Sequence, residues 1–133
     1  AVPEGSDIES MDDLEGKTVA VEWGSAGDMV GRRIMRDGID TKLAKYPTPQ
    51  EAVNGLLLDD SVDALLIDNV TLRTAQGTGA AIRAVGPALE SDPYVVAMPL
   101  RAGDLQKNVA EALKILTQEG TLDALEANWF SGQ

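Results

Sequence analysis

Short apolar runs alternate with amphipathic segments along most of the chain. The runs have the length of β-strands and are bounded by Gly, Pro or Asp. They cover residues 18–21, 42–46, 64–67, 82–85 and 94–98. Between them lie segments with the apolar spacing of helices. Strands that alternate with helices predict an α/β domain with a largely parallel sheet.

The clearest helix start lies at Thr48. Thr48 can cap the helix, Pro49 suits its first position, and Glu51 completes a capping box. The apolar stripe expected to be buried in this helix consists of Val53, Leu56 and Leu57.

The C-terminal part departs from the strand–helix alternation. Apolar residues recur at helical spacing from Asp104 to Glu119, and Gly120 stands where a helix commonly ends. A second short helix is expected after Thr121, with Trp129 packed on its apolar stripe. Two helices in succession either cover the sheet or dock on something outside this chain.

Composition removes several classes of function. The 133 residues include no Cys and no His, which excludes zinc-finger, iron–sulfur, thiol-nucleophile and histidine-base chemistry. With 22 acidic and 11 basic residues the formal charge is −11, so a nucleic-acid partner is disfavoured. No run approaches the roughly 20 apolar residues that span a bilayer.

The end of the first predicted strand is a candidate ligand site. Ligands of open parallel sheets bind where strands end and helices begin. Residues 22–28 contain small residues that allow a close approach of the backbone, and helix N–H groups there favour an anion. The alternative is a plain turn with a Ser25-x-x-Asp28 capping box. The spacing of Gly24, Gly27 and Gly31 does not fit the dinucleotide fingerprint, so a nucleotide cofactor is disfavoured.

A second candidate is Asp68, which ends the wholly apolar strand 64–67. Its carboxylate can pair with a ligand ammonium, or it can cap the helix that follows. The two interpretations are compatible because a carboxylate has two oxygens. Trp23 of the glycine loop could line a cleft or pack in the core.

Several ordered motifs together resemble the polar-amino-acid-binding proteins of ABC importers, extracellular solute-binding family 3. The motifs lie at residues 13–21, 24–25, 50–53, 62–68, 94–98, 113–120 and 128–130. The resemblance implies the type II periplasmic-binding fold, in which two α/β lobes close on an amino acid. Each lobe of that fold is a three-layer, open, mostly parallel sheet flanked by helices.

The family's first lobe has no counterpart in this sequence. Residues 1–99 therefore resemble the second lobe with its crossover strands, and 100–133 resemble the C-terminal helices that pack on the first lobe. The resemblance implies binding without catalysis, no cofactor or metal, and a periplasmic or extracellular location, with a lipid anchor as one option. It implies as partners an amino acid, the first lobe and a membrane permease. A homodimer could bury the same apolar helix stripes instead.

The family's site residues carry over by position. Asp68 resembles the acid that holds the ligand α-ammonium. Ser25, Ala26 and Gly27 fall on the loop that holds the α-carboxylate, next to Trp23 and Gly24, although Ala26 lacks the hydroxyl that many members carry there. Glu22 falls at the strand end that faces the ligand; it would favour a cationic ligand there, or have no effect if its side chain points to solvent.

Two other functions stay open for the same fold. The lobe also occurs in ligand-sensing domains of receptors and histidine kinases. Some relatives of the fold are dehydratases, for which Glu22 and Asp68 would be the acid or base candidates.

Overall fold

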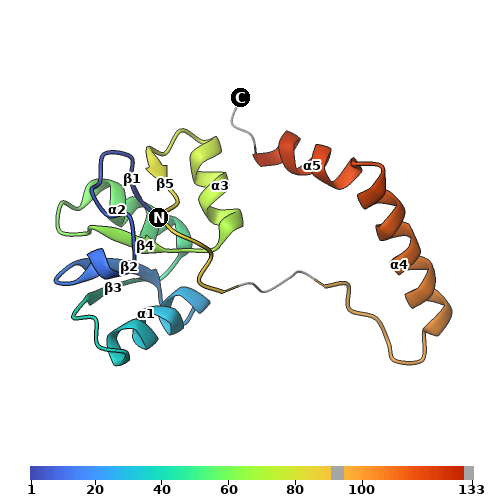
Figure 1. Ribbon diagram of the computed structural model, residues 1–133, viewed down its shortest axis with the longest axis horizontal. Coiled ribbons are helices and arrows are strands. Elements are labelled where there is room, and N and C mark those ends of the chain that lie inside the picture. Colours follow the sequence, from blue (N-terminus) through green and yellow to red (C-terminus); the bar gives the residue numbers. More distant parts are fainter. Residues whose placement is uncertain (91–94, 131–133) are drawn as a thin grey trace. The chain divides into compact units, whose positions relative to one another are not determined.

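The computed structural model describes residues 1–90 and 95–130, with the backbone alone at Phe130. The chain divides into two compact units (Figure 1). Unit 1 comprises residues 1–89, and unit 2 begins at Glu90.

Unit 1 is built on a parallel three-stranded sheet with the strand order β3-β2-β4. Its helices and strands alternate along the chain as predicted: β2 (Thr18–Glu22), α1 (Ala26–Arg36), β3 (Lys42–Tyr46), α2 (Pro49–Leu58), β4 (Ala64–Leu66) and α3 (Asn69–Gly77). A second, antiparallel pair joins β1 (Val2–Pro3) to β5 (Ile82–Arg83), and a short 3₁₀ helix covers Asp12–Leu14. The predicted α/β fold with a parallel sheet is confirmed.

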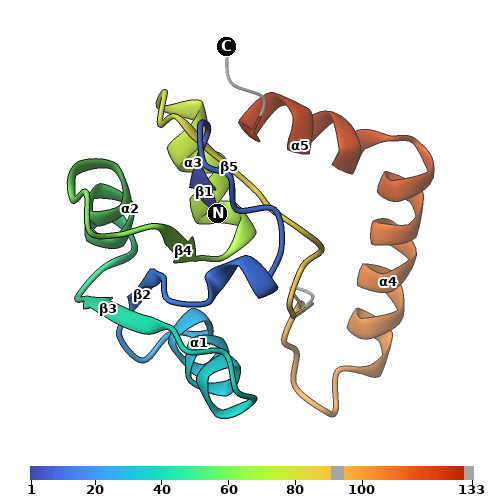
Figure 2. The same ribbon diagram turned by 60° about the vertical axis from the view of Figure 1, so that its left-hand side comes forward.

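The sheet is covered on both faces, because its three strands are largely apolar. Ala20 and Leu65 lie in one buried cluster with residues of α2 and α3. Successive strand residues point to opposite faces, so Leu43 and Leu66 lie on the other face, where they contact Gly31 of α1. Helix α1 therefore covers one face and α2 the other (Figure 2).

The start of α2 is the one that the sequence predicts. Thr48 Oγ1 accepts a hydrogen bond from the Glu51 N–H at 3.2 Å, and Pro49 occupies the first turn. Val53 and Leu56 are buried, but Leu57 is 39% exposed. The predicted buried stripe of α2 is thus wrong at Leu57, because this residue lines an open cavity.

The strand predicted at 94–98 is absent from the described residues. Tyr94 lies outside them, and 95–99 have no regular secondary structure. Val95 is 81% exposed. A strand needs a neighbour that supplies backbone hydrogen bonds, and no strand in the described part of the chain pairs with 95–98. The prediction at 82–85 is also too long, since β5 ends at Arg83.

In the described part of unit 2, residues 95–102 have no helix or strand and are followed by α4 (Gly103–Gln118) and α5 (Thr121–Phe130). Gly120 separates the two helices with a φ of +72°, a backbone conformation that favours glycine. No residue of α4 is buried, and Trp129 of α5 is 76% exposed. Trp129 therefore does not pack against the other described residues of unit 2, and the prediction that these helices pack on a first lobe stays a prediction. None of the described helices combines the length and apolar character needed to span a membrane.

We expect Gly27→Ala to destabilise unit 1. A methyl group at Gly27 would lie 2.6 Å from the backbone oxygen of Leu66, which cannot move without disturbing β4. Overpacking of this kind costs about 1–3 kcal/mol. Urea unfolding followed by circular dichroism gives the free energy of unfolding. Gly77→Ala is the matched control, because nothing lies within 4 Å of that position. Equal stability of the two variants would contradict this account of α1 packing.

Candidate functional site

The loops after β2 and β4 meet at one edge of the sheet, here called the carboxyl edge. β2 and β4 are parallel neighbours, with Val21 opposite Leu66. Both strands therefore end at the same level, and the residues that follow, 22–27 and 67–68, leave the sheet at the same place. The approach of Gly27 to the backbone of Leu66 brings the two segments into contact. The carboxyl edge is where ligands of such sheets bind.

Residues 22–27, here called the binding loop, are held by hydrogen bonds within the segment. Ser25 is the N-cap of α1: its Oγ accepts from the Asp28 N–H at 3.2 Å and donates to the Glu22 carbonyl at 2.8 Å. The Trp23 N–H donates to the Tyr46 carbonyl at 2.8 Å, which extends the pairing with β3. Gly24 has a φ of +77° at the sharp turn. The predicted cap at Ser25 is confirmed.

The second half of the predicted capping box differs in detail. In a capping box the acid three residues after the cap accepts from the cap's own N–H. Here the Asp28 carboxylate accepts from the Gly24 N–H at 3.1 Å, while the Ser25 N–H donates to the Glu22 carbonyl. Asp28 thus ties the turn at Gly24 to the first turn of α1.

The sequence predicts only a capping role for Asp28, whereas the structure shows that Asp28 also forms an ion pair. Its side chain is 2% exposed, and it accepts hydrogen bonds from Nε and Nη2 of Arg32 at 3.0 and 2.9 Å. The Arg32 hydrogen bonds lower the pKa of Asp28 to about 2; burial opposes this shift and the Gly24 N–H adds to it. The sequence feature that could have predicted this pair is the spacing of four residues between Asp28 and Arg32 on one helix.

Two N–H groups of α1 remain for a ligand. The first N–H groups of a helix have no partner within the helix. The Asp28 N–H is capped by Ser25, whereas Ala26 and Gly27 have no hydrogen-bond acceptor for theirs among the described residues. These two N–H groups, at the positive end of α1, suit a carboxylate.

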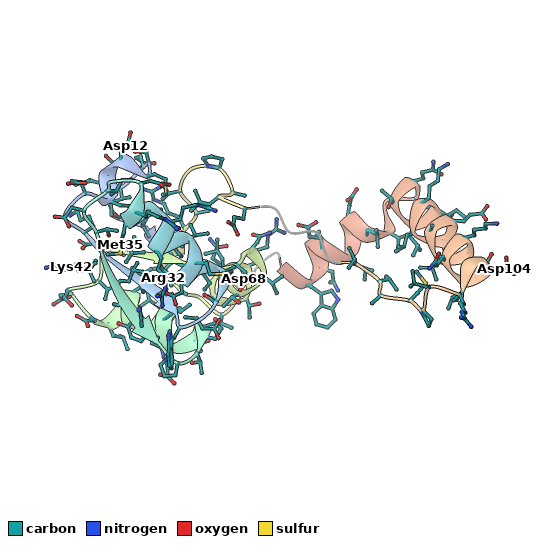
Figure 3. All side chains as sticks on the ribbon, turned by 90° about the horizontal axis from the view of Figure 1, so that it is seen from below. Asp12, Arg32, Met35, Lys42, Asp68 and Asp104 are labelled. Carbon is teal, nitrogen blue, oxygen red and sulfur yellow. The ribbon has the colours of Figure 1, made fainter. Side chains whose placement is uncertain are left out.

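Asp68 lies at the other loop of the carboxyl edge, as the N-cap of α3. Its Oδ1 accepts from the Thr71 N–H at 2.9 Å and its Oδ2 from the Thr71 hydroxyl at 2.6 Å. Partial burial raises the pKa of Asp68, but the bonds from Thr71 outweigh it and the pKa is lowered overall. The residue is exposed, so its carboxylate is charged and accessible. The capping interpretation is confirmed; Figure 3 shows Asp68 and Arg32 on unit 1.

Glu22 and Trp23 complete the set of predicted site residues. Glu22 is partly buried at the end of β2, and no described residue hydrogen-bonds to its carboxylate. Trp23 is 71% exposed. The indole therefore does not pack in the core of unit 1, which removes the packing alternative for Trp23.

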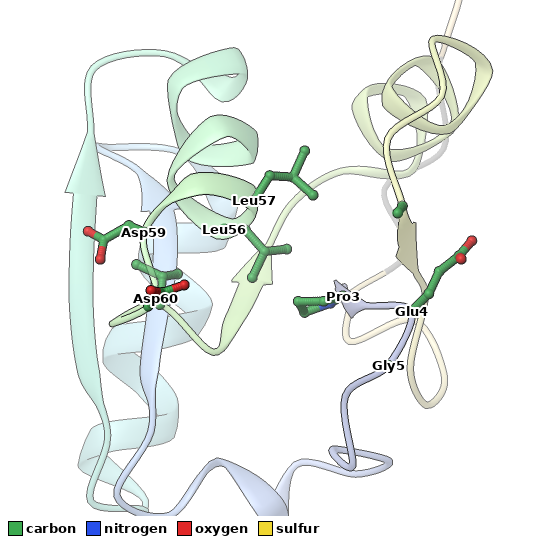
Figure 4. Close-up of a pocket in the computed structure, with 9 residues that line it drawn as sticks. Pro3, Glu4, Gly5, Leu56, Leu57, Asp59 and Asp60 are labelled. Atoms are coloured by element: carbon green, nitrogen blue, oxygen red, sulfur yellow. The ribbon is translucent and has the colours of Figure 1, made fainter.

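A cavity of about 450 Å³ lies away from these residues. It is open and lies between β1 and the end of α2 (Figure 4). Its lining is Pro3, Glu4, Gly5, Leu56, Leu57, Asp59, Asp60, Val62 and Ala81. None of the predicted site residues contributes to it, so the cavity is no part of the candidate site.

Comparisons with known proteins agree with the family resemblance. No protein-family model matches the chain. The L-cystine-binding protein TcyJ of Escherichia coli is 29% identical over 124 residues, which are 92% of this chain and 45% of TcyJ. PatH of Vibrio harveyi, whose name assigns it to amino-acid ABC transporters, is 29% identical over 133 residues, covering 97% of this chain and 52% of PatH.

Solved structures that are similar to this chain point to the same class of protein. An ancestral arginine-binding protein bound to arginine is 30% identical, with a TM-score of 0.67, and the match covers 97% of this chain and 57% of that protein. Domain 2 of TmArgBP is 29% identical with a TM-score of 0.51, over 65% of this chain and 91% of that domain.

The homologues of this chain are substrate-binding proteins of amino-acid ABC transporters. The chain spans about half the length of the relatives that it matches. Its fold is that of a lobe of such proteins, as the resemblance implies.

We expect Asp28→Asn to change the pH dependence of folding. The pKa of Asp28 is about 2 in the folded chain against an ordinary value of 3.8, so its ionisation stabilises the fold above pH 4 and this contribution is lost between pH 4 and 2. The variant should be less stable than the wild type at pH 7 and should lose less stability across that window. Asp12→Asn, at an exposed residue, is the control. Parallel stability curves for wild type and Asp28→Asn would contradict this role.

Proposed function

We propose that this chain is the second lobe of an extracellular solute-binding protein of an ABC importer, which binds an amino acid between its two lobes. The observation that carries the proposal is the polarity of the carboxyl edge. Unpaired N–H groups of Ala26 and Gly27 lie in one loop, and the charged carboxylate of Asp68 lies in the neighbouring one. A free amino acid carries both complementary charges, a carboxylate and an ammonium.

Each half of the ligand would meet a matching group. The α-carboxylate would accept hydrogen bonds at the start of α1, and the α-ammonium would donate to Asp68. Hydrogen bonds with a charged partner are roughly twice as strong as neutral ones. Asp68 already accepts two hydrogen bonds from Thr71, which fix its orientation before the ligand arrives.

The first lobe of such a protein would supply the remaining contacts. A ligand that touches both lobes favours the closed form by the difference in its affinity for the closed and open forms. A single lobe makes only part of these contacts, so this chain should bind an amino acid weakly when alone. The role is binding and delivery to a membrane permease, without catalysis, in the periplasm or outside the cell, with or without a lipid anchor.

The helices of unit 2 would pack on the first lobe. They expose the large apolar side chains of Leu105, Leu113, Ile115, Leu122, Leu125 and Trp129. Apolar surface of this kind usually finds a partner. We assign residues 100–133 to this role; a second copy of the chain is the alternative partner.

Titration of the ¹⁵N-labelled chain with single amino acids tests the proposed site. We expect a dissociation constant in the millimolar range, on the order of the affinity of a few polar contacts. Amide shifts should concentrate at Gly24 to Gly27 and at Asp68. Asp68→Asn should weaken binding about tenfold or more, because a charge-assisted bond is lost, while Asn still caps α3.

Asp59→Asn is the matched control for this titration. Asp59 also accepts from the N–H and hydroxyl of a nearby residue, Ser61, but it lies beside the cavity away from the carboxyl edge. Its variant should bind as the wild type does. Shifts spread around the cavity, or equal losses in both variants, would contradict the proposed site. A micromolar constant for the chain alone would contradict the need for a first lobe.

Glu22 should favour cationic amino acids. Its carboxylate is partly buried and lacks a described partner, so a ligand ammonium or guanidinium could pair with it. We expect the chain to bind L-arginine more tightly than L-glutamine, and Glu22→Gln to reduce that preference about tenfold. The two dissociation constants from the same titration give the ratio. An unchanged ratio in Glu22→Gln would show that Glu22 does not select the ligand.

A further inference from the structure

The ion pair of Asp28 and Arg32 lies directly behind the binding loop. Asp28 is the one acidic residue among those described whose side chain is buried. Its Oδ2 accepts from both the Gly24 N–H and Arg32 Nη2, and its Oδ1 accepts from Arg32 Nε. One carboxylate therefore joins the loop turn, the first turn of α1 and the guanidinium one turn further along the helix.

This arrangement creates an electrostatic conflict at the proposed anion site. Asp28 is in the first turn of α1, beside the Ala26 and Gly27 N–H groups that would receive a ligand carboxylate. A charged Asp28 stabilises the start of the helix, but it also repels a second anion at the same place. Burial lengthens the reach of that repulsion, because buried charges are screened less than exposed ones.

The positive charge of Arg32 lies where it can offset the negative charge of Asp28. Its fork geometry matches the Asp28 carboxylate with two parallel hydrogen bonds, an arrangement that lysine cannot reproduce. The guanidinium is half exposed, with 53% of its side chain accessible, while its partner is buried at 2%. The pair is neutral overall and leaves the dipole of α1 as the field that a ligand carboxylate meets.

We propose that Arg32 is a positioning residue for ligand binding: it neutralises Asp28 and thereby lets the binding loop accept the carboxylate of the ligand. The inference rests on the proposed function, since it presumes that the α-carboxylate binds at the start of α1. Arg32 itself makes no contact with the ligand. Its effect reaches the ligand through the charge of Asp28 and through the Gly24 turn.

Four forms of the full 133-residue chain separate a charge effect from a loss of structure. These are the wild type, Arg32→Gln, the double variant Asp28→Asn with Arg32→Gln, and the control Arg36→Gln. Arg36 lies one turn further along α1, so its variant changes the net charge equally. L-Arginine is the probe, and amide NMR at constant ionic strength gives its dissociation constant for each form.

We expect Arg32→Gln to weaken L-arginine binding about tenfold, the size expected for one uncompensated charge beside a partly exposed anion site. Arg36→Gln should bind as the wild type does. The double variant should regain most of the lost affinity, because removing the Asp28 charge removes the repulsion. L-Argininamide lacks the carboxylate, so its affinity should not fall in Arg32→Gln.

Three other outcomes would reject the inference, and each would indicate a different reason. If the double variant binds as weakly as Arg32→Gln, the pair acts only through structure. If Arg32→Gln binds L-arginine as the wild type does, Arg32 has no role in binding and the proposed function still stands. If the wild type shows no amino-acid binding at the carboxyl edge, both the proposed function and this inference fail. If the Arg32→Gln chain does not fold, the Arg32→Lys variant is measured instead. It should retain most of the affinity for L-arginine, because it keeps the positive charge.

Discussion

The parallel pairing of β2 with β4 is the constraint on which the proposed site depends. Because Val21 lies opposite Leu66, the chain leaves both strands at the same level, and the starts of α1 and α3 come to the same edge of the sheet. A glycine at position 27 allows α1 to approach the backbone of β4 at that point. The N–H groups of one helix start and the capping acid of the other then lie at the same edge of the sheet, as the proposed site requires.

The local chemistry of this edge could be predicted from the sequence because it is carried by short motifs. Ser25, Thr48 and Asp68 all cap the helices that their spacing indicates, and the strands of the sheet are apolar runs of the expected length. Parallel order followed from the alternation of strands and helices. The family resemblance, with its ordered motifs, added the expectation of a lobe, which the homologues confirm.

Features that depend on tertiary contacts could not be predicted in the same way. The apolar run at 94–98 has the composition of a strand, but no described strand pairs with residues 95–98. Trp23 and Trp129 have the side chains of core residues, and both are exposed. The burial of Asp28 with Arg32 also depends on how α1 packs on the sheet, which the spacing of an acid and an arginine does not reveal.

The two units differ in how far their apolar residues are buried. Unit 1 has a core on both faces of its sheet, while unit 2 has two helices and no residue of α4 is buried. A helix pair of this kind gains most of its stability from a surface that it covers. The same partner that would cover these helices, a first lobe, is the one that would complete the ligand site.

The most direct test of this account compares the binding of one amino acid to two forms of the protein. L-Arginine binding would be measured by titration for this chain alone and for the chain joined to the first lobe of an arginine-binding relative. If the carboxyl edge is half of a site shared between lobes, the joined protein should bind at least about 100-fold more tightly, a gain expected when a second set of contacts is preorganised. Equal affinity in the two forms would contradict the central claim.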